Sequence, residues 1–473
     1  MSVIYVLQSG KMRVLLFVVA LSLAIAPLLV ASTTKANASY APTALVTVWD
    51  TSSQKTITLP LSDSATDLDF TIDWGDATCP TSGPHTSLVS VTISCTFPAD
   101  VTAPEISIAG SKLPIWNFSL DVTSVAQITD VAQWGNIRLG NDGGYFAGAL
   151  NLDISATDAP ELKVNGTTNL AAMFSGNTSL TNPDFTGWDT SSVTDFSFMF
   201  AADLTGDPED PTVINGFNGD ISTWDVSGGT SFVGMFAGAK KFNQNIGRWD
   251  VSNGTNFLGM FAYATAFDQN IGYWDVSNGT NFEAMFAFAT AFNQNIGYWD
   301  VSNGTVFDNM FAFSTSFDQD ISYWNLTNAV SFVGFGDYAA SFNQNMSNWE
   351  FCASDPRDYA QGTTGSWQSD YRPTFLGGDY RICSPSFVNT KPAVRVKVDY
   401  VGSSGNQSYY WVGAPGTPTN SLPEAAQSEL VFTGWFTQQS LINGEQASTI
   451  EENGTVAGFI PPELAQVLGV SPD

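Results

Sequence analysis

A regular repeat runs through positions 217–350 and constrains the fold of this chain more than any other feature. Tryptophan recurs at every twenty-fifth position, at Trp224, Trp249, Trp274, Trp299, Trp324 and Trp349. Phenylalanine keeps the same interval, at Phe217, Phe242, Phe267, Phe292, Phe317 and Phe342. A fixed period of about 20–50 residues is the signature of stacked units that share one elongated core. The period therefore predicts a repeat protein, and such proteins usually act through a surface.

Apolar spacing predicts two kinds of segment in each unit. Steps of three and four separate Phe257, Met260, Phe261, Ala264 and Phe267, which is the pattern of one helix face. These residues, the Met-Phe pair included, are interpreted as core.

The string I-x-x-W-x-V at Ile271, Trp274 and Val276 predicts a short strand. In the turn after it, Asn278-Gly279 tolerates a positive φ, and Thr280 can cap the next helix. We expect an α/β solenoid with a parallel sheet on one face and short helices on the other.

The repeated strings resemble the 25-residue unit of the BspA-like leucine-rich-repeat surface proteins, which carry F-N-Q-[DN]-I-x-x-W-[DN]-V-S and M-F motifs. The matching strings are FNQNIGRWDVS (242–252), FDQNIGYWDVS (267–277), FNQNIGYWDVS (292–302) and FDQDISYWNLT (317–327). The resemblance implies a solenoid of leucine-rich-repeat type. Earlier Met-Phe pairs at 173–174 and 199–200 lengthen the array, and 203–212 is interpreted as a loop insertion. We place the solenoid at 128–350.

Short β-branched segments predict small β domains on both sides of the solenoid. TIDWGD (71–76), His85-Thr86 and VSVTISCTF within residues 39–127 resemble a PKD-like domain, a β-sandwich. LVFTGWFTQ (430–438) within residues 393–457 resembles the Listeria–Bacteroides repeat, a β-grasp-like module. Residues 351–392 would be a cap and linker, and 458–473 a tail.

The N-terminal residues have the pattern of a secretory signal. Lys11 and Arg13 precede an apolar run at 14–30, and Ala-Asn-Ala at 36–38 is a small-x-small cleavage site. We expect a signal peptide over 1–38, with an uncleaved anchor as the alternative. The expected location is extracellular, either secreted or attached to the cell surface, with no membrane span after cleavage.

Four cysteines fit an extracellular chain, because an even number there indicates disulfides. Proximity favours Cys79–Cys95 and Cys352–Cys383, and other pairings stay open.

The net charge of −29 disfavours nucleic acid and anionic lipid as partners. Loss of residues 1–38, which hold three basic residues and no acidic one, would make the charge still more negative.

Catalytic chemistry finds little support. The single histidine, His85, excludes most Ser-His-Asp and multi-histidine metal sites. Asp225, Asp250, Asp275 and Asp300 form a repeated column, but equivalent carboxylates do not provide the distinct acid and nucleophile of a glycosidase. We assign no catalytic residue, no metal ligand and no cofactor. Calcium bound by the stacked Asp and Asn side chains is the alternative, with turn bonding as the simpler explanation.

The residues between the buried apolar positions are expected to face outward on the sheet side. The candidate ligand-binding residues are Arg248, Asp250, Tyr273, Asp275, Tyr298, Asp300 and Tyr323. Exposed tyrosine gives contact area at low entropic cost, so we expect a non-enzymatic protein that binds an extracellular protein or a glycan. A structural spacer is the alternative, and a carbohydrate-active enzyme a weaker one. The ligand and the oligomeric state stay open.

Overall fold

The computed structural model describes residues 4–8, 11–15, 40–62, 67–76, 79, 82–88, 93–118, 124–202, 215–326, 328–347, 349–351, 374–375, 394–402, 405–413 and 430–436. The chain forms two compact units. The first comprises Met1–Asp189, Phe198–Gly219 and Gly238–Lys240, and the second comprises Thr190–Ser197, Asp220–Ala237 and Lys241–Asp473.

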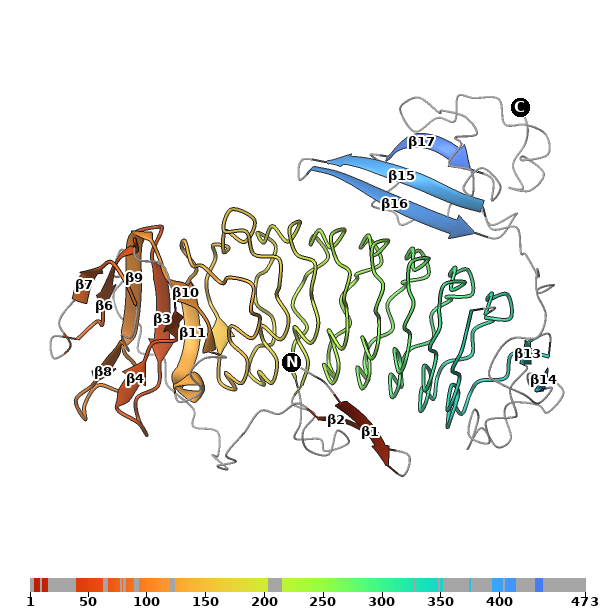
Figure 1. Ribbon diagram of the computed structural model, residues 1–473, viewed down its shortest axis with the longest axis horizontal. Coiled ribbons are helices and arrows are strands. Elements are labelled where there is room, and N and C mark those ends of the chain that lie inside the picture. Colours follow the sequence, from red (N-terminus) through yellow and green to blue (C-terminus); the bar gives the residue numbers. More distant parts are fainter. Residues whose placement is uncertain are drawn as a thin grey trace. The chain divides into compact units, whose positions relative to one another are not determined.

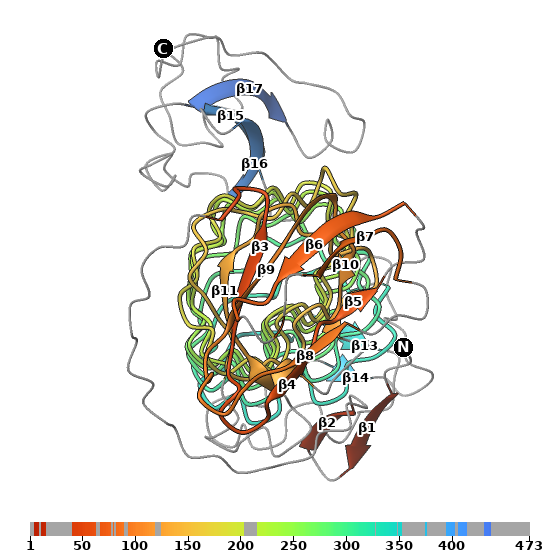
Figure 2. The same cartoon turned by 90° about the vertical axis from the view of Figure 1, so that its left-hand side faces the viewer.

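A six-stranded sheet of order β12-β11-β3-β9-β6-β7 lies in the first unit (Figures 1 and 2). The strands are β3 (Leu45–Trp49), β6 (Asp69–Asp73), β7 (Ser82–His85), β9 (Glu105–Lys112), β11 (Ile128–Gln133) and β12 (Asp153–Ile154). All neighbours are antiparallel except β11 and β12, which are parallel. Buried and more exposed side chains alternate along β6, since Phe70 and Ile72 are buried while Asp69 and Asp73 are exposed. This alternation shows which face of β6 points toward the core. The β structure predicted in this region is confirmed, and its PKD-like type stays a prediction.

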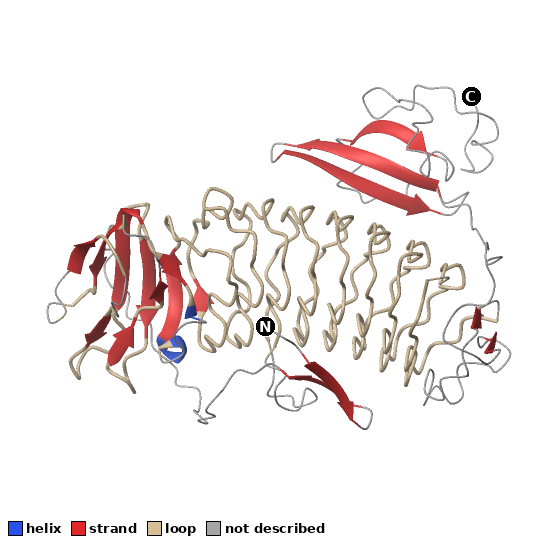
Figure 3. Cartoon of the chain, in the orientation of Figure 1, coloured by secondary structure: helices blue, strands red, loops and turns tan. Residues whose placement is uncertain are grey.

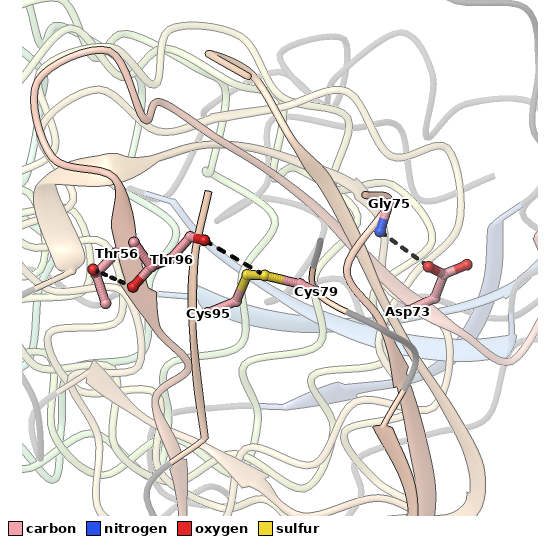
Figure 4. The surroundings of a disulfide bond; sticks show 6 residues. All are labelled: Thr56, Asp73, Gly75, Cys79, Cys95 and Thr96. Atoms are coloured by element: carbon pink, nitrogen blue, oxygen red, sulfur yellow. Dashed lines mark hydrogen bonds between the residues drawn. A yellow bond between two sulfur atoms is a disulfide. The ribbon is translucent and has the colours of Figure 1, made fainter. Parts of the chain in front are cut away.

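Two small antiparallel pairs accompany this sheet. They are β4 (Thr56–Thr58) with β8 (Ser94–Thr96), and β5 (Leu61–Ser62) with β10 (Ile115–Trp116). The disulfide Cys79–Cys95, whose Cα atoms are 6.0 Å apart, ties β8 to the segment after β6 (Figure 4). This predicted pair is confirmed. Cys352 and Cys383 lie outside the described residues.

Strands β1 (Ile4–Gln8) and β2 (Lys11–Leu15) form an antiparallel hairpin inside the segment predicted as the signal peptide. Most of the apolar run at 14–30 lies outside the described residues. Among the described residues, no helix is long and apolar enough to cross a membrane.

The repeats begin within the first unit. After the short 3-10 helix η2 (Val125–Gln127), β11 pairs with β3, so residues 128–133, expected in the solenoid, belong to the N-terminal sheet. Farther along, backbone bonds join equivalent positions of successive repeats. Phe174 N donates to Met199 O at 2.9 Å, and Gly176 N donates to Ala201 O at 2.8 Å. The array is therefore longer than its regular copies, as predicted. The loop expected at 203–212 lies outside the described residues.

In the second unit each 25-residue coil is hydrogen-bonded to the next. Alternate N–H groups donate to carbonyl oxygens of the following coil, at Phe257 to Asn281 (2.9 Å), Gly259 to Glu283 (2.8 Å), Phe261 to Met285 (2.9 Å) and Tyr263 to Ala287 (2.8 Å). Parallel bridges join Ser231, Asn256, Asn281, Val306 and Ser331 in turn. Successive coils thus lie side by side and parallel (Figure 1).

The helix predicted over 257–267 is wrong. The coils consist of turns and loops (Figure 3). No α-helix occurs in the described part of the chain, where the named helix η2 is of the 3-10 type. The N–H groups that an α-helix would bond within its own segment are donated to the neighbouring coil instead. Positive φ values at Gly259 and Tyr263, 60° each, also break the helix. The predicted inward-facing set is right, because Phe257, Met260, Phe261, Ala264 and Phe267 are all buried.

The strand predicted at Ile271, Trp274 and Val276 is also wrong. Trp274 N donates to Ile271 O at 3.1 Å, which closes a turn. Parallel pairing occurs farther along, at Asn281. All three apolar side chains are buried, as predicted. Stacked repeats are therefore present, but the described coils lack the helices and strands expected of an α/β solenoid. Their likeness to leucine-rich repeats stays a prediction.

Aromatic side chains fill the core of the coils in columns. Phe267 stacks on Phe242 and Phe292 with centroid distances of 5.9 and 6.0 Å. Trp274 lies parallel to Trp299 at 6.5 Å, and its indole Nε1 donates to Ile246 O at 3.0 Å. The same bond recurs at Trp249, Trp299 and Trp324. Tryptophan at this position fills the core, and its buried indole N–H donates to a backbone carbonyl oxygen of the preceding coil.

Among the described residues of the C-terminal part of the second unit, five strands occur. β15 (Val394–Gly402) pairs antiparallel with β16 (Gly405–Gly413) and β17 (Leu430–Phe436), while β13 (Glu350–Phe351) pairs parallel with β14 (Thr374–Phe375). Strands are thus present where the 393–457 module was predicted, and its likeness to the Listeria–Bacteroides repeat stays a prediction.

Candidate ligand-binding surface

The candidate tyrosines lie in turns, each next to a buried tryptophan. Tyr273, Tyr298 and Tyr323 are half-buried, and so is Arg248. The expected sheet face is wrong, because no strand is present at these positions. The four residues do occupy equivalent places in successive coils, partly held by neighbours and partly accessible.

The aspartates of the candidate surface bond to the backbone of their own coil. Asp275 Oδ1 accepts the N–H of Ser277 at 3.1 Å. Asp250 and Asp300 accept from Ser252 and Ser302, both at 3.0 Å. A side-chain oxygen that accepts from the second residue on forms an Asx turn. This bond explains why the residue recurs, and the predicted role in ligand binding is left untested.

A second Asx turn precedes each tryptophan. Asn270 Oδ1 accepts from Gly272 N at 3.0 Å, and Asn295 Oδ1 from Gly297 N at 3.0 Å. A Cβ on Gly272 would lie 2.2 Å from Asn295 O. Glycine is therefore required here for the close approach of the next coil.

The F-[ND]-Q string forms a polar ladder between coils. Asp268 Oδ1 accepts from Asn293 N and from Gln294 Nε2, both at 2.9 Å. Asn293 Oδ1 accepts in the same way from Asp318 N and Gln319 Nε2, both at 2.9 Å. Along this ladder Asn and Asp alternate, at Asn243, Asp268, Asn293, Asp318 and Asn343. The alternation keeps carboxylates two coils apart, which lowers like-charge repulsion.

The Asn-Gly-Thr string also joins coils. Asn278 Nδ2 donates to Ser252 O at 2.7 Å, and Thr280 Oγ1 donates to Thr255 O at 3.0 Å. The predicted helix cap at Thr280 is therefore wrong, because its hydroxyl bonds to the preceding coil. Gly279 does not have a positive φ either.

Two half-buried acids lie one coil apart, at Glu283 and Asp308. Burial, and then the charge of Asp308, raises the pKa of Glu283. Burial raises the pKa of Asp308, although Ser331 and Val333 donate hydrogen bonds to its carboxylate. No group of three or more His, Cys, Asp or Glu in the described ranges could hold a metal ion. Calcium binding by the Asp and Asn columns is left as a prediction.

One feature of the coils was missed by sequence reasoning. Tyr263, Phe288, Phe313 and Tyr338, here called the aromatic ladder, stack in successive coils with centroid distances of 4.3, 4.3 and 4.5 Å. All four have positive φ, between 57° and 60°. Their regular spacing in FAYATAF, FAFATAF and FAFSTSF was the available signal.

His85, the single histidine of the chain, stacks on Phe70 in the N-terminal sheet with ring centroids 5.0 Å apart.

Comparison with known proteins gives a family and no function. No curated protein and no solved structure matches the chain. Residues 118–208, 212–297 and 270–363 each match the family described as "Mycoplasma protein of unknown function, DUF285". Taken together, the three matches cover just over half of the chain and include the coils described above. The chain therefore belongs to the DUF285 family of repeat-containing proteins.

Proposed function

We propose that this protein is a secreted or cell-surface-associated, non-enzymatic binding protein. Its coils would present the column of Arg248, Tyr273, Tyr298 and Tyr323, with the neighbouring aspartates, to an extracellular protein or a glycan.

The observation that carries the proposal is the equivalent, half-buried setting of the three tyrosines in successive coils. A side chain that is already partly held by its neighbours loses little conformational freedom on binding. Three such side chains at a regular interval favour an extended ligand, because its contacts can be repeated along the stack.

A carbohydrate-active enzyme finds less support. Asp250, Asp275 and Asp300 each make the same bond to the serine two positions on. Equivalent surroundings do not separate the pKa values of an acid and a nucleophile, which glycoside hydrolysis requires.

A structural spacer is the second candidate. It is favoured by the use of Asp268, Asn278, Thr280 and Gln294 for bonds between coils. In that case the stack would only display its end domains.

A screen of the full chain on arrays of glycans and extracellular proteins tests the proposal. The matched comparison is a variant with Tyr273, Tyr298 and Tyr323 replaced by Ser. The control replaces Thr255, Thr280 and Thr305 by Ser, which keeps the hydroxyl donors of that column. We expect the wild type and the threonine control to bind a ligand specifically, and the tyrosine variant to lose that binding. Binding that all three proteins share would favour the spacer.

A further inference from the structure

The aromatic ladder has an unfavourable backbone. Left-handed φ is disfavoured for any residue with a Cβ, and most strongly for bulky ones. Gly238, which holds the equivalent place one repeat before Tyr263, has a φ of 73°. The next four coils carry an aromatic residue in place of this glycine. Strain of this kind clusters at binding sites.

The ring faces of the ladder are not equally covered. Phe288 and Phe313 each stack between two rings, nearly parallel to both, at interplanar angles of 8° to 13°. Tyr263 is 5% exposed, whereas Tyr338, which has one ring neighbour among the described residues, is 44% exposed. Phe288 and Phe313 are half-buried, so Tyr338 has the most accessible ring of the four.

Two other apolar side chains of the same coil as Tyr338 are exposed. Val330 is 51% exposed and Val333 is 36% exposed. These three residues are most of the large hydrophobic side chains exposed in the described part of the chain. The carboxylate of Asp308 accepts the N–H of Val333 at 2.7 Å, so an acidic group lies next to Val333.

The charge of this region is of one sign. Residues 249–351 contain ten acidic residues and no Lys, Arg or His. Such a surface repels anionic ligands and a second copy of itself, and it attracts cations. A ligand for Tyr338 must therefore be compatible with a flat ring face and with a negative potential.

We propose that the ring of Tyr338 binds the guanidinium group of an arginine-bearing segment of an extracellular protein. This inference rests on the proposed binding function and adds a ligand class and a second site to it. A guanidinium is planar and cationic, so it stacks on an aromatic face. A lysine ammonium has the charge and lacks the plane.

The test is a titration of the full chain with the end-blocked peptide Gly-Gly-Arg-Gly-Gly, followed by NMR or calorimetry. Peptides with lysine or with neutral citrulline in the central position are the ligand controls. We expect saturable binding of the arginine peptide and weaker binding of both controls. No saturable binding, or equal affinity for all three peptides, overturns the inference.

Two variants locate the site. Tyr338→Ala should weaken arginine-peptide binding by about threefold to tenfold, the range expected for loss of a cation–π contact. Tyr338→Phe, which keeps the ring face, should bind as the wild type does. Equal binding by wild type and Tyr338→Ala would place the peptide elsewhere and overturn the inference.

Failure of this inference is distinguishable from failure of the proposed function. The variant with Tyr273, Tyr298 and Tyr323 replaced by Ser should keep its affinity for the arginine peptide. If that variant loses an array ligand while Tyr338→Ala keeps peptide binding unchanged, the proposed function stands and only the guanidinium site is overturned.

Discussion

A Cβ atom on Gly279 would lie 2.4 Å from Cζ of Phe282, so glycine at this position leaves room for a ring of the core. Phe282 stacks between Phe257 and Phe307, with centroid distances of 5.6 and 5.3 Å. In a later coil Ala329 replaces the glycine, and there Phe332 is tilted by 53° from Phe307. In the same coil Phe335 takes the place of the methionine and stacks on Phe332 at 4.0 Å, so two substitutions accompany the tilt.

We expect Gly279→Ala to destabilise the protein, because Phe282 must leave its column. Overpacking of a core costs about 1–3 kcal/mol, which urea unfolding measures. Gly187→Ala is the control, since its Cβ would make an ordinary contact of 3.4 Å with Ala159. Equal stability of the two variants would mean that the space beside Phe282 is not limiting.

Asn293→Asp should destabilise the polar ladder at neutral pH. The substitution keeps the acceptor oxygen and puts a third carboxylate between Asp268 and Asp318. Like charges on directly adjacent strands cost roughly 0.2–1 kcal/mol, and added salt should reduce the loss. The control Asp268→Asn keeps the acceptor and removes a charge, so it should not destabilise. Thermal unfolding at low and high salt checks both, and a loss independent of salt would contradict the electrostatic explanation.

Glu283→Gln should stabilise the protein at neutral pH and have less effect in acid. Burial raises the pKa of Glu283 in the folded state. A carboxyl group with a raised folded pKa destabilises the fold once it ionises, so its cost is absent below the unfolded pKa and appears as pH rises through the folded pKa. Unfolding between about pH 3 and pH 8 tests this, with the exposed Glu161→Gln as control. A gain that is equal at all pH values would rule out the titration of Glu283 as its cause.

At Phe313, glycine should be tolerated better than alanine. Both substitutions remove the ring, but only glycine relieves the left-handed backbone, where φ is 60°. Since a Cβ there costs roughly 1–2 kcal/mol, Phe313→Gly should be the more stable variant by about that amount. Ala262→Gly, at a residue without positive φ, is the control and should destabilise by about 0.5–1 kcal/mol. If Phe313→Ala proves as stable as Phe313→Gly, the backbone of the aromatic ladder is not strained.

Sequence reasoning predicted which side chains are buried better than it predicted the backbone that carries them. Phe257, Met260 and Phe261 have helical spacing and are buried, yet the N–H groups of Phe257 and Phe261 bond to the next coil. A helix and a coil of turns can both bury apolar side chains that recur at steps of three and four residues. The choice between them depends on bonds to the neighbouring repeat, which a local pattern does not contain.

The predicted role of Gly279 was also wrong. Asn278-Gly279 was interpreted as a positive-φ turn, whereas Gly279 is needed for the space that Phe282 occupies. Left-handed φ occurs instead at Gly259 and Ala284, and four positions later at Tyr263 and Phe288. No propensity scale favours aromatic residues there, so only their regular spacing gave a signal.

The sequence predicted that the candidate site residues occupy equivalent positions in successive coils. It did not predict the local backbone geometry at those positions. Period alone places Tyr273 and Tyr298 alike in successive coils. It could not show that Asp275 closes an Asx turn, because that bond requires the chain to turn at Ser277.

The most direct test of the proposed function is the equilibrium dissociation constant for a ligand found in the array screen. It should be measured for the wild type, the triple tyrosine variant and the threonine control, with unfolding temperatures recorded in parallel. We predict that the tyrosine variant loses binding by tenfold or more, about 1.4 kcal/mol, while all three proteins unfold at similar temperatures. Equal dissociation constants for the wild type and an intact tyrosine variant would contradict the proposal that this column is the binding surface.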